Sequence, residues 1–173
     1  MSIEIAQVES PVGAFRAVVD DGVVRKAAFI SDRGVHRDRY GVHDALAAYF
    51  NGEVDALESI TAAPEGTSFQ REVWKRLREI RAGETASYGE LAQRVGKPNA
   101  ARAVGMANAS NPIALIVPCH RIIRTGGAIG GYGFGVETKR WLLDHEASSS
   151  GRYSIGTLGT ILAPARSMIS SRL

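Results

Sequence analysis

The chain has 173 residues, of which 45% are hydrophobic and 23% charged, as is typical of a soluble globular protein. No apolar run is long enough to cross a membrane and the amino terminus lacks a signal-peptide pattern, so we expect a cytoplasmic protein. The charge is uneven, because residues 1–66 carry six Lys/Arg against eleven Asp/Glu and residues 67–173 carry fifteen against seven. A basic second half is typical of a surface that meets a polyanion, although an ordinary basic surface explains the charge equally well.

The first thirty residues alternate between apolar and polar positions, as strands do. Apolar residues gather in three runs, at 3–8, 15–19 and 23–29, and turn-forming residues separate these runs. This pattern predicts a three-stranded antiparallel meander. A helix is expected around His43–Phe50, and the acidic stretch after it is the natural linker. We interpret residues 1–66 as a small α+β scaffold domain without chemistry of its own.

From residue 67 onward the pattern becomes helical. Apolar residues recur at helical spacing from Phe69 to Ile80, and Thr67 is the expected amino-terminal cap of that helix. Ser87 and Glu90 have the spacing of a capping box, in which the serine and glutamate side chains bond the backbone amides of the first turn. A second, short helix is therefore predicted to begin directly after Ser87.

A further helix is expected at Ala100–Asn108, with Asn99 as its cap and a tight glycine-containing turn before it. Two short helices joined in this way are typical of helix-turn-helix proteins, although many helical hairpins share the spacing. Within this helix Arg102 is surrounded by small side chains, among them Ala101. Small side chains allow a helix to approach either a DNA groove or a neighbouring helix closely, and both interpretations stay open.

The last part of the chain carries its chemistry. An apolar run at 113–117 leads into Pro118-Cys119-His120-Arg121, and six glycines follow between residues 126 and 135. So much glycine indicates turns with positive φ or a close approach of the backbone to a ligand. A final helix is expected at about Glu137–Glu146, and residues 148–173 are interpreted as a flexible tail.

Cys119 is the only cysteine, which excludes an internal disulfide and a cysteine-cluster zinc site. A lone cysteine is by default a small buried hydrophobe. Here His120 follows it directly, and Asp144 or Glu146 lies downstream as an acid that can orient the histidine, which is the arrangement of an activated thiol. Adjacent side chains on a strand point to opposite faces, so this arrangement needs a turn, which Pro118 favours.

The segment IVPCHRIIRTGGAIGGYGFGVETKRWLLDHE resembles the active-site region of the O6-alkylguanine-DNA alkyltransferases, also called methylated-DNA–protein-cysteine methyltransferases. The similarity continues upstream through SYGELAQRVGKPNAARAVGMANASNP and extends over residues 1–147. It implies an α+β fold in which a small amino-terminal domain with a three-stranded antiparallel sheet precedes a mainly helical domain at 67–147. This second domain holds the helix-turn-helix and the active-site loop, and residues 148–173 lie outside both domains.

The resemblance also implies direct-reversal DNA repair. In this reaction one alkyl group moves from O6-alkylguanine in double-stranded DNA to Cys119, with O4-alkylthymine as a further candidate substrate. Cys119 matches the alkyl acceptor, and His120 matches the base that takes the thiol proton through a water. Glu146 matches the acid that holds this histidine, and Asn111 matches the residue that orders the turn before the cysteine. The thioether product limits the protein to one turnover, and the chemistry requires no metal and no organic cofactor.

Other residues match the groups that receive the damaged base. Tyr88 and Lys139 match groups that neutralise charge on O6 as guanine leaves. The loop at Tyr132 and Gly133 matches the wall of the base pocket. Phe134 departs from the family pattern, because family members often have a small residue there, and this change is expected to alter which alkyl groups fit.

The resemblance further assigns a DNA-binding surface. Arg102 matches the arginine that enters the duplex and fills the gap left by the extruded base, and Ala101 belongs to the small-residue surface around it. Arg94, Lys97 and Arg121 are expected to contact phosphates, unless they are ordinary solvated charges. A monomer suits a protein that is consumed by its own reaction.

Three alternatives come from other functional classes. A non-reactive protein that only recognises alkylation damage would use the same fold, but that class replaces the cysteine. A regulator that uses only the helix-turn-helix would need neither the nucleophile nor the glycine-rich loop. A hydrolase built on cysteine, histidine and glutamate is a more distant option, because the sequence shows no amide-binding signature.

Overall fold

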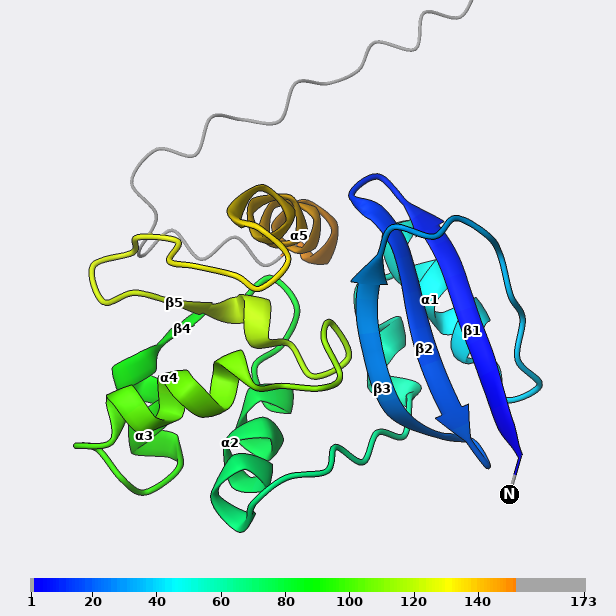
Figure 1. The fold of residues 1–173 in the computed structure, drawn as a ribbon. Helices are drawn as coiled ribbons and strands as arrows, with labels where there is room; N and C mark the ends of the chain where they lie inside the picture. Colours follow the sequence, from blue (N-terminus) through cyan, green and yellow to red (C-terminus); the bar gives the residue numbers. More distant parts are fainter. Residues whose placement is uncertain (1, 152–173) are drawn as a thin grey trace, which may run out of the picture.

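The computed structural model describes residues 2–151 and begins with the predicted antiparallel meander (Figure 1). Its strands are β1 (Ile3–Ser10), β2 (Gly13–Asp20) and β3 (Val23–Ile30), in the order β1-β2-β3. Between β2 and β3, Asp21 and Gly22 have φ values of 46° and 83°, the two positive values that a tight type I′ hairpin requires. The predicted turn chemistry therefore produces the hairpin directly.

The helix α1 (Val42–Phe50) lies against this sheet, behind it in the view of Figure 1. Phe50 at the end of α1 meets the ring of Phe15 on β2, with the ring centroids 6.4 Å apart. The Asp38 carboxylate accepts hydrogen bonds from the first-turn amides of Val42 and His43, at 3.2 and 2.7 Å. A short 3-10 helix, η1 (Ala56–Ser59), follows.

The second half consists mainly of helices. They are α2 (Ser68–Arg78), α3 (Tyr88–Arg94), α4 (Ala101–Ala109) and α5 (Val136–Ser150). The strands β4 (Ala86–Ser87) and β5 (Ile122–Ile123) form a short parallel pair, and the 3-10 helix η2 (Cys119–Arg121) directly precedes β5. Among the described residues, no helix is long and apolar enough to span a membrane.

The predicted caps account for two of these helices. Thr67 and Gln70 form a complete capping box at α2, and Ser87 and Glu90 form a second one at α3. The Trp74 ring nitrogen donates to the Ala107 carbonyl at 2.8 Å, which joins α2 to α4 beneath the helix-turn-helix. These bonds fix the orientation of α3 and α4 relative to the rest of the second half.

Two boundaries differ from the prediction. Asn99 does not cap α4, because the helix begins at Ala101 and its cap position, Ala100, offers no side-chain acceptor. The last helix continues to Ser150, so residues 148–150 are helical rather than part of a flexible tail. The remainder of that predicted tail, from residue 152 onward, lies outside the described residues.

Backbone hydrogen bonds join the two halves at β3. The Ala27 amide donates to the Pro112 carbonyl at 3.0 Å, and the Ala114 amide donates to the Ala27 carbonyl at 2.9 Å. The segment after η1 also pairs with β3, because the Val24 amide donates to the Thr61 carbonyl at 2.9 Å. The predicted linker is therefore attached to the sheet, and the sheet extends to the segment that carries the cysteine.

Candidate active site and DNA-binding surface

A series of tight turns positions Cys119. The apolar run at 113–117 is fully buried, and Leu115 within it adopts a left-handed φ of 66°. Asn111 holds this turn on both sides, because its side-chain nitrogen donates to the Val117 carbonyl at 2.8 Å and its oxygen accepts from the Ile113 amide at 3.0 Å. The turn thereby brings the thiol and His120 into one site.

Glu146 of α5 is the centre of a buried hydrogen-bond network. His120 Nε2 lies 2.7 Å from Glu146 Oε1, and Arg121 donates through Nε and Nη2 to the two carboxylate oxygens, each at 2.9 Å. The Tyr49 hydroxyl donates to Oε1 at 2.7 Å. All four side chains are at most 7% exposed. The structure therefore places Glu146, and not Asp144, beside the histidine.

The protonation states in this network follow from burial and charge. Burial alone would raise the pKa of Glu146, but its interactions with His120 and Arg121 outweigh that effect and hold the pKa well below the usual range. Burial lowers the pKa of His120, so the imidazole is neutral at neutral pH. Because Glu146 is an ionised acceptor, we assign the imidazole proton to Nε2, which leaves the lone pair on Nδ1. Nδ1 is buried and has no hydrogen-bond partner among the described residues.

Cys119 is a protonated thiol at rest. It is 7% exposed, and burial raises the pKa of its thiol above the ordinary value. A hydrogen bond from Asn111 and the positive charge of Lys139 offset only part of this rise. The thiol therefore needs a base before it can react, and the next residue in the chain is the neutral His120.

Lys139 and Tyr88 are the two further ionisable groups close to the thiol. Lys139 is 1% exposed, and its ammonium donates to the Ile122 carbonyl at 2.6 Å. Burial lowers the pKa of Lys139 to about 8, so its proton is easily released near neutral pH. Tyr88 is half-buried, and burial raises the pKa of its hydroxyl. Both groups are proton donors within the electrostatic reach of Cys119.

Aromatic side chains connect the glycine-rich loop to the site and to the sheet. Burial, together with the neighbouring Cys119, raises the pKa of the Tyr132 hydroxyl, and the Tyr132 ring lies edge-on to Phe134 with centroids 5.5 Å apart. Phe134 also meets Phe29 of β3 at 5.5 Å and remains 37% exposed. The bulky side chain at position 134 thus packs against the amino-terminal sheet beside Tyr132 and the exposed Gly133.

The small-residue helix α4 turns one face to solvent. Arg102 is exposed and makes no hydrogen bond or ion pair within residues 2–151, while its neighbour Ala101 is half-buried. Gly105, on the same helix, faces the ring of Tyr88, where an added Cβ would lie 3.5 Å from the ring carbons. The exposed Arg94 on α3 and the exposed Lys97 after it lie on the same helix-turn-helix. The helix-turn-helix therefore carries exposed cations on its surface, and its residue Tyr88 lies close to Cys119.

Arg121 differs from its expected role as a phosphate contact. Its guanidinium is 7% exposed and is fully engaged by Glu146 and by the Ile80 carbonyl, which accepts from Nη1 at 2.5 Å. A buried guanidinium paired in this way cannot also reach the DNA backbone. Sequence adjacency to Cys119 suggested a surface cation, whereas the turn directs this side chain inward.

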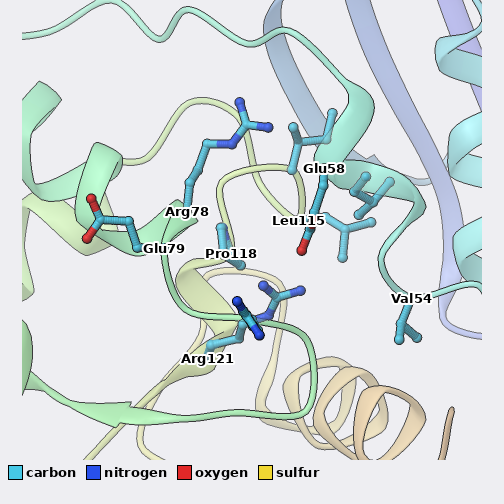
Figure 2. A pocket seen from close by; sticks show the side chains of 10 residues that line it. Val54, Glu58, Arg78, Glu79, Leu115, Pro118 and Arg121 are labelled. Carbon is cyan, nitrogen blue, oxygen red and sulfur yellow. The ribbon is translucent and has the colours of Figure 1, made fainter. Parts of the chain in front are cut away.

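A cavity of about 400 Å³ opens behind the cysteine turn, at the junction of the two halves. Figure 2 shows Arg78 and Arg121 on either side of Pro118, with Val54 and Leu115 completing the lining from the other elements. Cys119 and Lys139 do not line it. The cavity is therefore separate from these two reacting groups. No group of three or more metal-binding side chains occurs in the described part of the chain.

Three residues of the site lay outside the sequence-based prediction. Tyr49 belongs to the half interpreted as a scaffold, yet it donates to Glu146. The Asn108 side chain donates to the Cys119 carbonyl at 3.4 Å. Arg124 is an exposed cation that acts on Tyr88 and Lys139. A tyrosine on an apolar helix face needs a buried partner for its hydroxyl, which is the one local signal that pointed to Tyr49.

The low pKa of Glu146 predicts a loss of stability in acid. Because the folded-state pKa lies below the ordinary value of 4.5, the ionised carboxylate contributes stability that is complete above that value. This contribution should be lost progressively as the pH falls below about 4.5. Urea unfolding between about pH 7 and about pH 2 measures the effect, and Glu137→Gln, at an exposed position of α5, should retain the same acid dependence as the unchanged chain. A free energy of unfolding that stays level across this range would contradict the assignment.

The site contains a buried cysteine, followed in the chain by a histidine that is hydrogen-bonded to a carboxylate, and it adjoins a helix-turn-helix. These features define the class of proteins that combine a candidate nucleophilic thiol with a DNA-binding type of fold. Residues 68–148 match the family described as 6-O-methylguanine DNA methyltransferase, DNA binding domain. The methylated-DNA–protein-cysteine methyltransferase of Methanosarcina acetivorans is 41% identical over 150 residues, which are 81% of this chain and 96% of that protein. The chain therefore belongs to the family of methylated-DNA–protein-cysteine methyltransferases.

Two further comparisons give the extent of the similarity. The protein of the same name from Shigella flexneri is 52% identical over 106 residues, 61% of this chain and 62% of that relative. This match thus spans less than two thirds of the relative's length. The crystal structure of Mycobacterium tuberculosis OGT in complex with DNA matches with a TM-score of 0.73 at 40% identity, over 84% of this chain and 93% of that chain. The α+β architecture with an amino-terminal three-stranded sheet agrees with the predicted fold class.

Proposed function

We propose that this chain repairs alkylated DNA by moving one alkyl group from O6 of guanine to Cys119. The observation that carries the proposal is the neutral His120, held through Nε2 by Glu146 at 2.7 Å, with its Nδ1 lone pair buried and unpartnered in the described part of the chain. This lone pair accepts the thiol proton through a bridging water. The thiolate then attacks the alkyl carbon, a carbon–sulfur bond forms, and the bond between that carbon and O6 breaks.

The electron pair of the broken bond returns to guanine, and a proton neutralises it. Tyr88 and Lys139 are the donors placed for this step, and the lowered pKa of Lys139, about 8, suits proton release near neutral pH. The products are unmodified guanine and a thioether on Cys119. A thioether is not reversed by simple hydrolysis, so each molecule reacts once. A monomer suits a protein that is consumed in this way, and we place the reaction in the cytoplasm, where its DNA substrate lies.

The reacting base has to leave the duplex to reach a buried thiol. Extruding a base costs a few kcal/mol, and a wedge that fills the gap offsets part of that cost. Arg102 is suited to this task, because it is exposed on a helix whose small neighbours allow close approach to the minor groove. The Tyr132–Phe134 segment provides the wall against which the extruded base rests.

The test is the intact mass of the protein after it is mixed with an excess of duplex DNA that contains one O6-methylguanine. We expect a gain of one CH₂ unit, as a methyl group replaces the thiol hydrogen, mapped to Cys119 and absent in Cys119→Ala. A folded protein that binds the damaged duplex without gaining mass would overturn the proposal in favour of damage recognition alone. A duplex with O4-methylthymine, tested in the same way, measures the breadth of the substrate range.

A further inference from the structure

Arg124 occupies a rigid position at the mouth of the cysteine site. It directly follows β5, its amide donates to the Ala128 carbonyl at 2.8 Å, and its carbonyl accepts from the Gly127 amide at 3.0 Å. Gly126 and Gly127 in this turn have φ values of 89° and 87°, which glycine adopts without strain. The backbone of Arg124 is therefore fixed by the sheet on one side and by a closed turn on the other.

The Arg124 side chain lies beside the proposed proton donors. A Cβ placed on Gly130 would be 3.5 Å from Arg124 Cγ, 3.8 Å from Arg124 Nε and 3.8 Å from Lys139 Nζ, so both cationic side chains border the same glycine. The positive charge of Arg124 lowers the pKa of Tyr88 and of Lys139. Two cations thus face one small region of the loop next to Cys119.

Within residues 2–151, no carboxylate forms an ion pair with either of these two cations. The Arg124 side chain is exposed and forms no hydrogen bond or ion pair with any described residue. The Lys139 ammonium donates hydrogen bonds to the Ile122 and Gly131 carbonyls, at 2.6 and 3.3 Å, and these bonds fix its position. Glu137, the nearest carboxylate in sequence, pairs with Arg140, and the buried Glu146 is already committed to His120 and Arg121. An uncompensated pair of neighbouring cations favours the binding of an external anion.

The chemistry of the proposed substrate identifies this anion. An extruded nucleotide remains attached to the strand through its two flanking phosphates, which stay at the mouth of the site when the base enters. The planar guanidinium of an exposed arginine binds phosphate oxygens in pairs, and its long side chain reaches outward where the buried Lys139 cannot. Arg121, which the sequence suggested for phosphate contact, is occupied in the interior.

We propose that Arg124 binds a backbone phosphate adjacent to the extruded nucleotide and so holds that nucleotide in the site. This inference rests on the alkyl-transfer function proposed above. The contact forms with any DNA that carries the damaged base, whether that DNA is double- or single-stranded. A free O6-methylguanine base, which has no phosphate, does not use the contact.

The test compares Arg124→Ala with the unchanged chain on three substrates: damaged duplex, damaged single strand and the free O6-methylguanine base. Loss of one charge-assisted hydrogen bond should slow single-turnover transfer from both DNA substrates by roughly ten- to a hundredfold. Transfer from the free base should be slowed less than transfer from either DNA substrate, because only the effect of Arg124 on the pKa of Tyr88 and Lys139 is lost there. Arg124→Lys should retain part of the DNA rate. The matched control is Arg33→Ala, which removes an exposed arginine from the amino-terminal half, and it should react as the unchanged chain does.

A second measurement does not depend on the reaction. In the Cys119→Ala background the complex with damaged duplex does not react, and its dissociation constant can be followed against salt concentration. Removing Arg124 should reduce the slope of log K against log salt by about 0.9, the value for one phosphate contact on duplex DNA.

Two results would overturn the phosphate contact: an equal slowing on the free base, which assigns Arg124 to the electrostatics of Tyr88 and Lys139, or an unchanged salt slope. If the unchanged chain transfers no alkyl group at all, the proposed function fails, and the salt slope still decides the role of Arg124. The unfolding midpoint of each variant establishes that it is folded.

Discussion

Replacing Glu146 by glutamine is expected to lower the free energy of unfolding by about 3–5 kcal/mol. The substitution changes one oxygen to an amide and leaves the Arg121 guanidinium buried at 7% exposure without a counter-charge. It also puts an amide donor where the Tyr49 hydroxyl and His120 Nε2 both donate. A buried charge that loses its partner costs far more than a surface pair, because water cannot replace that partner.

The same substitution should slow alkyl transfer by roughly 10²–10⁴-fold. Without the ionised acceptor, the imidazole is no longer held with its proton on Nε2, and the Nδ1 lone pair is no longer directed toward the thiol. Single-turnover rates and urea unfolding of Glu146→Gln measure both effects. The control is Glu137→Gln on the same helix, where the carboxylate is 86% exposed and pairs with Arg140, and the stability should change by less than about 0.5 kcal/mol. Equal stability and rate in the two variants would remove Glu146 from the mechanism.

Replacing Arg102 by alanine is expected to slow transfer from duplex DNA by roughly 10²–10³-fold, the equivalent of a few kcal/mol of unstacking. The side chain is exposed on α4 and makes no contact that supports the fold within residues 2–151, so the variant should unfold at the same denaturant concentration. Transfer from a single-stranded oligonucleotide should be nearly unaffected, because that substrate has no base pair to open.

The control for this prediction is Arg94→Ala on α3, which also removes an exposed cation of the helix-turn-helix. A phosphate contact contributes salt-dependent affinity without distinguishing paired from unpaired bases. We therefore expect Arg94→Ala to weaken the binding of damaged and undamaged duplex alike. If Arg102→Ala behaved in the same way, its side chain would be a phosphate contact and not a wedge.

Local sequence signals predicted the elements that local interactions form. The hairpin turn at Asp21 and Gly22 and the capping boxes at Thr67 and Ser87 each depend on residues within three positions of one another. Where caps were inferred from residue type alone, Thr67 was correct, but Asn99 was wrong, because α4 begins at Ala101, one residue later than predicted, with Ala100 at its cap position. Residue type without a reciprocal partner was therefore an unreliable signal.

The site was less predictable, because its contacts join distant parts of the chain. Tyr49 and Glu146 are 97 positions apart, and neither periodicity nor spacing relates them. The acid beside His120 was left open between Asp144 and Glu146, and only the packing of α5 decides it. Arg121 was misjudged for the related reason that a turn, unlike a strand, does not alternate its side chains, so adjacency to Cys119 did not reveal its direction.

The bonds between the two halves have a mechanical consequence. Ala27 of β3 exchanges hydrogen bonds with the Pro112 and Ala114 backbone on either side of Ile113, at the start of the segment that leads to the cysteine, and the Tyr49 hydroxyl donates to the buried Glu146 carboxylate. A hinge motion that opened the halves would have to break all of these bonds at once, with a buried charge among the groups exposed. We therefore expect the two halves to keep their relative orientation when the protein binds a duplex, so that the DNA has to bend to deliver the base. The energy of this bending depends on the DNA sequence around the lesion, and the stiffness of that sequence then contributes to which lesions react first.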